Sequence, residues 1–308
     1  MLTRETMEGI YVLPPTPFDE DGVFDEDALR ENVRRLAEAG ISAYVTTGSV
    51  GEFHTISPQD HQRLAKALAE SCQQAGIVSV CGCSGVNTDE AIMKVTWAQN
   101  AGCDAVMNVS PYYIQLTRDE LVNYWRDLAA ACPRIGLIVY NNPQTSQLHD
   151  EETYAEIVKI PTLCGSKEAH YDFSLWYRLH RAFPQLGLFT ATEPEWILPT
   201  LKLGARGIFS MAASMIHHFI VELYQACRKG QWDKAGKMQT EWEAMQRRIG
   251  SHEALQGYNG VARFKAIVNA FGYLRCGYSR RPLISVPKDN QERLAEFVRK
   301  NFAGLIRG

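Results

Sequence analysis

The sequence predicts a (β/α)8 barrel, the TIM-barrel fold, followed by a C-terminal helical extension. Short apolar runs alternate with amphipathic helical stretches along the first two thirds of the chain. These runs are apolar throughout, which is typical of parallel strands that are covered on both faces. There are eight such runs, and eight βα units favour a closed barrel over an open doubly wound sheet. No GxGxxG motif follows the first run, which further disfavours a dinucleotide-binding sheet.

The elements can be assigned in chain order. The expected strands are residues 10–16, 41–47, 77–83, 105–110, 136–142, 162–167, 186–192 and 207–213. The expected helices between them are residues 25–39, a helix that begins at 57, and residues 88–101, 117–131, 150–160, 173–183 and 195–203. The second helix begins at Ser57-Pro58, which combines a favourable N-cap with a proline at the first helical position.

After residue 213 the pattern changes to helices alone. They are expected at residues 216–228, 231–249, 260–271 and 290–302. Because a barrel needs only one of them to close, we expect two parts. Residues 1–228 form the barrel, and residues 229–308 form a helical extension packed on it.

Composition narrows the class of protein. The chain has 308 residues, of which 45% are hydrophobic and 22% charged, so it can bury a sizeable core. A formal net charge of -3 gives no attraction to nucleic acid or to an anionic membrane. There is no apolar run of about 18 residues and no signal-peptide pattern at the start, so we expect no membrane span and a cytoplasmic location.

Two groups of residues are of types that bind metals, and neither is expected to do so. The eight cysteines are scattered, and buried free thiols in a reducing cytosol are the favoured interpretation. Cys81-Gly82-Cys83 could bind a metal, but no His or Cys follows it at finger-like spacing. His217-His218 lies where a helix should begin, and adjacent residues on a helix point apart. We therefore expect no metal.

The active site of such a barrel lies at the carboxyl ends of its strands, and Lys167 is the only lysine at any of these ends. Lysine is rarely buried without a reason, and desolvation would favour the nucleophilic free amine. The alternative is a solvated loop lysine that pairs with Glu168.

Two further strand ends could complete such a site. Tyr140 ends the neighbouring strand, where its phenol could shuttle protons, although a tyrosine in this position is often only packed. Gly48-Ser49-Val50-Gly51 follows the second strand and could cradle a carboxylate with its backbone N–H groups, or could be only a tight turn.

Six motifs occur in a recognisable order over nearly the whole chain. They are Pro15-Thr16-Pro17-Phe18, Gly48-Ser49-Val50-Gly51-Glu52, Pro111-Tyr112-Tyr113, Tyr140-Asn141-Asn142-Pro143, Gly165-Ser166-Lys167-Glu168-Ala169 and Leu203-Gly204-Ala205-Arg206-Gly207-Ile208. With these motifs in register, the sequence resembles the dihydrodipicolinate synthase / N-acetylneuraminate lyase family of class I, Schiff-base aldolases.

The resemblance implies roles for the matched positions. Lys167 would form an imine with the C2 carbonyl of a 2-oxo acid, and Tyr140 would be the general acid and base. Ser49 would link Tyr140 into a hydroxyl relay, which Tyr113 would complete from a neighbouring subunit. The backbone N–H groups of Ser49 and Val50 would hold the substrate carboxylate. The imine would replace any cofactor, and a homotetramer built from dimers would be the assembly.

Departures from the family pattern bear on the substrate. Val50 stands where these enzymes carry a hydroxyl residue, and Thr145 stands where dihydrodipicolinate synthases carry an arginine for the carboxylate of their second substrate. Thr192 and Glu193 stand where the family usually carries a pair of smaller residues, so they should narrow that side of the substrate pocket. Phe209 and Trp196 could each add apolar surface to the substrate pocket, or could be packed in the core.

Taken together, we expect a Schiff-base lyase that cleaves a 2-oxo acid to pyruvate and an aldehyde. A 2-keto-3-deoxy-sugar-acid dehydratase or a deaminase that uses the same imine is the alternative, and a non-catalytic keto-acid sensor is a third. Synthesis of dihydrodipicolinate is disfavoured because of Thr145.

Overall fold

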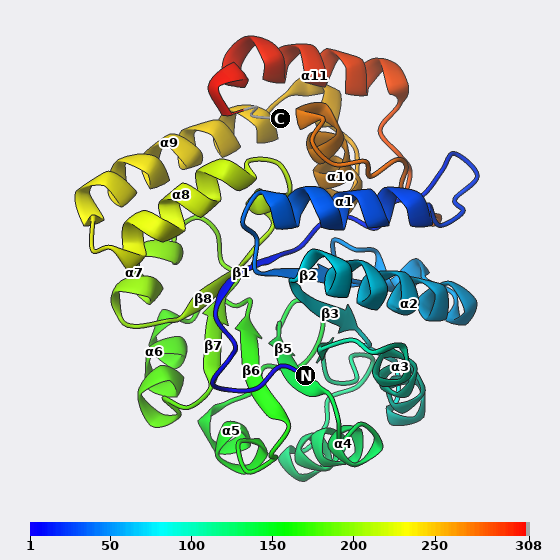
Figure 1. Ribbon diagram of the computed structural model, residues 1–308, viewed down its shortest axis with the longest axis vertical. Helices are drawn as coiled ribbons and strands as arrows, with labels where there is room; N and C mark the ends of the chain where they lie inside the picture. The colour runs from blue at the N-terminus through cyan, green and yellow to red at the C-terminus, as the bar shows by residue number, and fades with distance from the viewer. Residues whose placement is uncertain (306–308) are drawn as a thin grey trace.

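The computed structural model describes residues 1–305 and confirms the predicted (β/α)8 barrel. Eight parallel strands follow one another around the barrel in chain order, and the first pairs with the last. The helices that follow the strands surround the barrel, as Figure 1 shows in a view that looks into it. The last three residues of the predicted extension, 306–308, lie outside the described residues.

The strands are four to six residues long, and all but β6 are shorter than the apolar runs that predicted them. They are β1 (Gly9–Val12), β2 (Ala43–Thr46), β3 (Val78–Gly82), β4 (Ala105–Asn108), β5 (Gly136–Asn141), β6 (Leu163–Glu168), β7 (Gly187–Thr190) and β8 (Gly207–Ser210).

Each strand is followed by a helix, and three more helices end the chain. They are α1 (Glu26–Glu38), α2 (Pro58–Ala75), α3 (Thr88–Ala101), α4 (Arg118–Ala131), α5 (Glu151–Ile157), α6 (Phe173–Ala182), α7 (Ile197–Lys202), α8 (His217–Arg228), α9 (Trp232–Gly250), α10 (Gly260–Phe271) and α11 (Lys288–Phe302). Short 3-10 turns lie at Phe53–Thr55, Ala212–Ser214, Glu253–Leu255 and Ala303–Leu305.

Polar caps fix where the barrel helices begin. The Ser57 hydroxyl accepts the backbone N–H of Asp60, with Pro58 at the first helical position, as the sequence predicts. Thr117 and Glu120 form a reciprocal capping box at the start of α4. These caps satisfy backbone N–H groups that a helix leaves without partners, and they set the lengths of the loops that carry the site.

Side chains divide the core into two layers. One set fills the inside of the barrel, where the ring of Tyr11 packs edge-on against those of Phe189 and Phe209 at 5.5 and 5.2 Å between centroids. A larger set lies between the strands and the helices. Because successive residues of a strand point to opposite faces, each strand contributes to both layers.

The N-terminal segment closes the amino end of the barrel. Met7 is fully buried there. A Cβ on Gly165 would lie 2.4 Å from the Met7 sulfur, and one on Gly187 would lie 2.8 Å from it. Glycine at these two positions therefore makes room for the methionine, and the opposite, carboxyl end is left for the site.

The helices after the barrel pack beside α1, α7 and α8 (Figure 1). α9 contacts α7 and α8, whereas α10 and α11 contact each other. The division of the chain after residue 228 remains a proposal, and that residue is the last of α8. Among residues 1–305, no helix is long and apolar enough to cross a membrane.

Candidate active site

Lys167 and Tyr140 face each other across two adjacent strands. Tyr140 of β5 is the register partner of Lys167 of β6, so the two side chains leave the sheet at the same level and on the same face. The Lys167 side chain is buried, with Nζ 3.8 Å from the centroid of the Tyr140 ring. The ring of Phe209 lies beneath, 5.8 Å from the same nitrogen. The predicted amine and phenol are thus together inside the barrel.

The alternative interpretation, a solvated Lys167 paired with Glu168, is wrong. Successive strand residues point to opposite faces, and Glu168 faces the helices rather than the barrel interior. Its carboxylate accepts hydrogen bonds from Tyr154 at 2.6 Å, from Asn141 at 2.9 Å and from the neighbouring Ser166 hydroxyl, and it contacts His170 at 2.8 Å. These partners hold the pKa of Glu168 below its usual value despite its burial. Glu168 therefore anchors the end of β6 from outside.

Tyr140 is the centre of a small hydroxyl network. Its oxygen lies 3.3 Å from the Ser49 hydroxyl and accepts a hydrogen bond from Asn142 Nδ2 at 3.1 Å. Burial opposes ionisation of the phenol, but the charge of Lys167 and the hydrogen bonds from Ser49, Lys167 and Asn142 outweigh it. The pKa of Tyr140 therefore lies below its usual value, which suits a group that gives and takes protons.

The loop after β2 carries two backbone donors that have no partner. Within the described residues, the N–H groups of Ser49 and Val50 make no hydrogen bond, and both residues are only half-buried. Thr47 and Glu52, on either side, have positive φ angles of 48° and 58°. A Cβ on Gly51 would lie 2.8 Å from the backbone nitrogen of Thr47, so this tight turn requires glycine. The loop can receive an anion in the way the sequence predicts.

A buried ion pair fixes this loop to the C-terminal helices. Glu52 Oε1 lies 2.5 Å from Nζ of Lys265 in α10, and both side chains are at most 2% exposed. The Lys265 amine also donates to the backbone oxygens of Thr16 and Tyr278 at 2.8 and 2.7 Å. A further hydrogen bond joins the Thr16 hydroxyl to the oxygen of Gly51 at 2.6 Å. The conformation of the loop thus depends on residues more than 200 positions away.

Glu193 is the acidic group of the opposite wall. Its Oε2 accepts the backbone N–H groups of Met211 and Ala212 at 3.0 and 3.2 Å. Burial raises the pKa of Glu193 to about 7, and these hydrogen bonds, together with the charge of Lys167, offset only part of that effect. An apolar cavity of about 220 Å³ lies between Glu193, the segment 211–215 that follows β8, and helices α9 and α10.

The other predicted site residues make no hydrogen bond to Lys167 or Tyr140 within residues 1–305. The Thr192 hydroxyl donates to the backbone oxygen of His170 at 3.0 Å, and Trp196 packs in the outer layer against the ring of His170. The Thr145 hydroxyl donates to the oxygen of Asn142 at 3.3 Å. Tyr113 is 87% exposed and, within residues 1–305, makes no hydrogen bond to the Ser49–Tyr140 pair.

Sequence reasoning assigned no role to three residues of this site. Asn142 could have been found, because it lies two positions after Tyr140 in the strand-end motif and so leaves on the same face. Glu193 was noted only for its size. Lys265 left no local signal, since its place beside Glu52 is set by the docking of α10.

Known proteins resemble this chain over nearly its whole length. The sequence model of the Dihydrodipicolinate synthetase family matches residues 6–301. A 4-hydroxy-tetrahydrodipicolinate synthase of Methanopyrus kandleri is 31% identical over 301 residues, which are 96% of each chain. A second one, from Methanothermobacter thermautotrophicus, is 32% identical over 77% of this chain and 84% of its own.

Solved structures share the fold. A dihydrodipicolinate synthase from Acinetobacter baumannii, solved with pyruvate, superposes with a TM-score of 0.84 at 24% identity, over 97% of this chain and all of that one. An N-acetylneuraminate lyase from Fusobacterium nucleatum superposes with a TM-score of 0.82 at 22% identity, over 96% of this chain and 99% of that one.

The fold, the buried lysine and the matching family together define the class of protein: it is an enzyme, a lyase of the Schiff-base, class I aldolase type. The chain belongs to the dihydrodipicolinate synthetase family.

Proposed function

We propose that this enzyme reversibly cleaves a 2-oxo acid to pyruvate and an aldehyde through a covalent imine on Lys167. The observation that carries the proposal is the buried Lys167 amine, 3.8 Å from the centre of the Tyr140 ring, with the Tyr140 oxygen in reach of Ser49. An amine nucleophile with an adjacent proton-transfer group is what imine chemistry on a ketone requires. No further cofactor is needed, because the iminium accepts the electrons itself.

The first half of the reaction forms the iminium. The substrate carboxylate binds the free N–H groups of Ser49 and Val50, which places the C2 carbonyl over Lys167. The neutral amine adds to C2, and the carbonyl oxygen takes up protons through Tyr140 and leaves as water. The product is a C=N bond to Lys167 that carries one positive charge.

The second half breaks the C3–C4 bond. Tyr140 takes the proton of the C4 hydroxyl, the C4–O bond becomes a carbonyl, and the electron pair of the C3–C4 bond moves onto the iminium to give an enamine. The aldehyde leaves, C3 takes up a proton, and water hydrolyses the imine to pyruvate and the free amine. The lowered pKa of Tyr140 makes the phenolate accessible for the first of these transfers.

The assembly is part of the proposal. Tyr113 and the adjacent Ile114 are 87% and 62% exposed, which is unusual for neighbouring large apolar side chains. We place them at the contact between two subunits, where Tyr113 would extend the Ser49–Tyr140 relay of the partner, in a homotetramer built from such dimers. A cytoplasmic location is proposed from the eight free, buried cysteines.

Synthesis of 4-hydroxy-tetrahydrodipicolinate is the second candidate, and the names of the curated relatives favour it. Thr145 argues against it, because this side chain offers a hydroxyl in place of an arginine for a second carboxylate. Val50, which stands where these enzymes carry a hydroxyl residue, and the ring of Phe209 near Lys167 instead favour a substrate whose distal group is uncharged.

A panel of hydroxylated and aryl-substituted 2-oxo acids, assayed for pyruvate release, tests the proposal. We expect release from at least one of them, and slow synthase turnover with pyruvate and aspartate semialdehyde. Thr145→Arg should increase synthase turnover, with Thr145→Val as the matched control. Conversion of a substrate without pyruvate release would indicate a dehydratase or deaminase, and fast synthase turnover in the unmodified enzyme would favour the second candidate. The absence of any turnover would favour a keto-acid sensor.

A further inference from the structure

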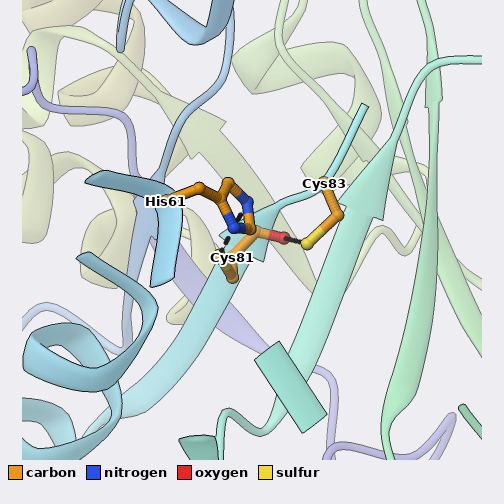
Figure 2. A group of neighbouring side chains, drawn as sticks. All are labelled: His61, Cys81 and Cys83. Atoms are coloured by element: carbon orange, nitrogen blue, oxygen red, sulfur yellow. Dashed lines mark hydrogen bonds between the residues drawn. The ribbon is translucent and has the colours of Figure 1, made fainter. Parts of the chain in front are cut away.

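A cluster of soft metal ligands lies behind the site, between β3 and α2. Cys81 and Cys83, at the end of β3, face the helices, and His61 faces them from the first turn of α2 (Figure 2). One donor atom from each of the three lies within 4.8 Å of the others, and all three residues are buried. None of them takes part in the chemistry proposed for Lys167.

The contacts within the cluster are weak ones. His61 Nε2 lies 3.8 Å from Cys81 Sγ and 3.0 Å from the Gly82 oxygen, and Cys83 Sγ lies 3.5 Å from the Cys81 oxygen. Nδ1 of His61 is buried and has no hydrogen-bond partner among residues 1–305. A further buried thiol, that of Cys103, interacts with Cys81; it donates to the backbone oxygen of Ala65 at 3.5 Å and lies outside the group of three donor atoms.

We propose that His61, Cys81 and Cys83, with Cys103 as the fourth ligand, bind one Zn²⁺ ion at a structural site. Three sulfurs and one imidazole nitrogen are a common donor set for tetrahedral zinc. The 3.8 Å between His61 Nε2 and Cys81 Sγ is close to what bonds of about 2.0–2.1 and 2.3 Å at a tetrahedral angle require. A zinc-finger spacing requires the further ligands to follow Cys83 in the sequence. Here the histidine precedes Cys81 by 20 residues, so that pattern could not reveal it.

Charge and burial agree with a dication here. Three thiolates and a neutral imidazole leave the occupied site with a single net negative charge, because Zn²⁺ cancels two of the three thiolate charges in this apolar layer. Cysteine binds zinc as the thiolate, so metal binding by these thiols must release protons.

The position of the cluster gives the ion a structural consequence. Ligation by His61 Nε2 would break its contact with the Gly82 oxygen, but that oxygen keeps the hydrogen bond from the Thr47 hydroxyl at 2.7 Å. A Cβ on Gly82 would lie 2.2 Å from the Thr47 oxygen, so the two backbones are in direct contact. An ion between α2 and β3 would therefore cross-link the wall that supports the loop at Ser49.

The test is reconstitution of the full chain. Because the site is fully buried, the reduced protein is unfolded and refolded with one equivalent of Zn²⁺ or Co²⁺, and metal that is not bound is removed by gel filtration. We expect about one ion per chain, release of protons during loading, and a higher melting temperature for the loaded protein. The cobalt form should show thiolate-to-cobalt charge transfer and the strong visible bands of tetrahedral coordination, both lost when Zn²⁺ is added.

Variants locate the ion. A double variant, Cys81→Ser with Cys83→Ser, should lose the metal and the cobalt bands, whereas Cys132→Ser, at a buried thiol outside the cluster, should keep both. Refolded wild-type protein that retains no metal would overturn the proposal, as would a double variant that folds and retains as much as the control. If the double variant does not fold, the cobalt spectrum of the unmodified chain decides: bands of six-coordinate cobalt without charge transfer would refute thiolate ligation.

Discussion

Lys167 and Lys265 are both almost fully buried, at 4% and 1% exposure, yet their amines have opposite surroundings. Lys265 has a carboxylate oxygen of Glu52 at 2.5 Å and two backbone oxygens within 2.8 Å, one acceptor for each of its three N–H bonds. Lys167 faces the rings of Tyr140 and Phe209, and within residues 1–305 it forms no ion pair.

The difference shows that burial alone does not identify a nucleophilic lysine. Burial lowers the pKa of Lys265 although Glu52 opposes this effect, but all three N–H bonds of its amine are held by buried acceptors, so it is closed to a substrate. Among residues 1–305, the Lys167 amine has no such set of acceptors, and it lies beside the Tyr140 phenol inside the barrel, where the proposed 2-oxo acid would bind. Four experiments test the difference between the two lysines and the roles of the residues around them.

The largest expected effect is that of Lys167→Met on catalysis. Loss of the nucleophile should lower turnover by at least about 10⁴-fold, while the unfolding free energy changes little because no buried partner loses its counter-charge. Borohydride reduction in the presence of pyruvate, followed by peptide mapping, should modify Lys167 in the wild-type enzyme and nothing in the variant. If Lys167→Met were labelled equally, or if the label were found on Lys265, Lys167 would not be the residue that forms the imine.

Tyr140→Phe separates the amine from its proton-transfer partner. Turnover should fall by about 10²- to 10⁴-fold, the usual contribution of a general acid and base, while some borohydride trapping at Lys167 remains. Ser49→Ala is the milder companion, since it removes one hydrogen bond from the same phenol. Nearly unchanged turnover in Tyr140→Phe would mean that this ring is only packed.

Lys265→Met tests the other member of the comparison. The Glu52 carboxylate would remain buried without its partner, so the unfolding free energy in urea should fall by about 3–5 kcal/mol. The double variant Glu52→Gln with Lys265→Met should recover part of that loss, because no unpaired charge remains. Borohydride labelling of the folded fraction should still occur at Lys167. The KM of this variant for the 2-oxo acid should be higher, because the loop that would bind the carboxylate is less well fixed. A neutral single variant would show that the pair does not fix the loop.

The smallest effect is expected from Glu193. Its pKa is raised to about 7, so the fold favours the protonated carboxyl, and this contribution to stability is complete below about pH 4.5 and lost as the pH rises through 7. The side chain of Glu193→Gln cannot ionise. The unfolding free energy of this variant relative to the wild type should therefore rise between pH 5 and pH 8, by about 1–2 kcal/mol for a partly exposed group. Urea unfolding at four pH values in that interval measures the difference, and parallel curves would contradict the raised pKa.

Much of this fold is readable in the sequence, because barrel strands are apolar on both faces and their helices carry polar caps. All eight strands occur in the predicted order, but every apolar run except that of β6 is longer than its strand. The run at 10–16 forms a strand only over Gly9–Val12, because the hydrogen-bonded ladder ends where β1 leaves β8, while residues 13–16 remain buried without a strand partner. Burial and pairing are separate properties, and hydropathy reports only the first.

The contacts of the site are likewise of two kinds, those that chain order predicts and those that it does not. The meeting of Lys167 and Tyr140 follows from consecutive strands of a parallel barrel, so chain order predicts it. The contacts of Glu52 with Lys265 and of His61 with Cys81 join elements through the outer layer, where the docking of each helix sets the neighbours. Local spacing carries no signal for such pairs.

The ion pair between Glu52 and Lys265 also has a consequence in time. A ribosome makes the chain from its N-terminus, and the strand and loop that present Ser49 and Val50 are complete more than 200 residues before Lys265 is synthesised. Until α10 docks, the Glu52 carboxylate has no lysine partner, and the anion-binding loop lacks the contact that fixes it to the C-terminal helices. Affinity for the 2-oxo acid should therefore appear late in synthesis, after the barrel strands, so that nascent chains bind no substrate before they are nearly finished.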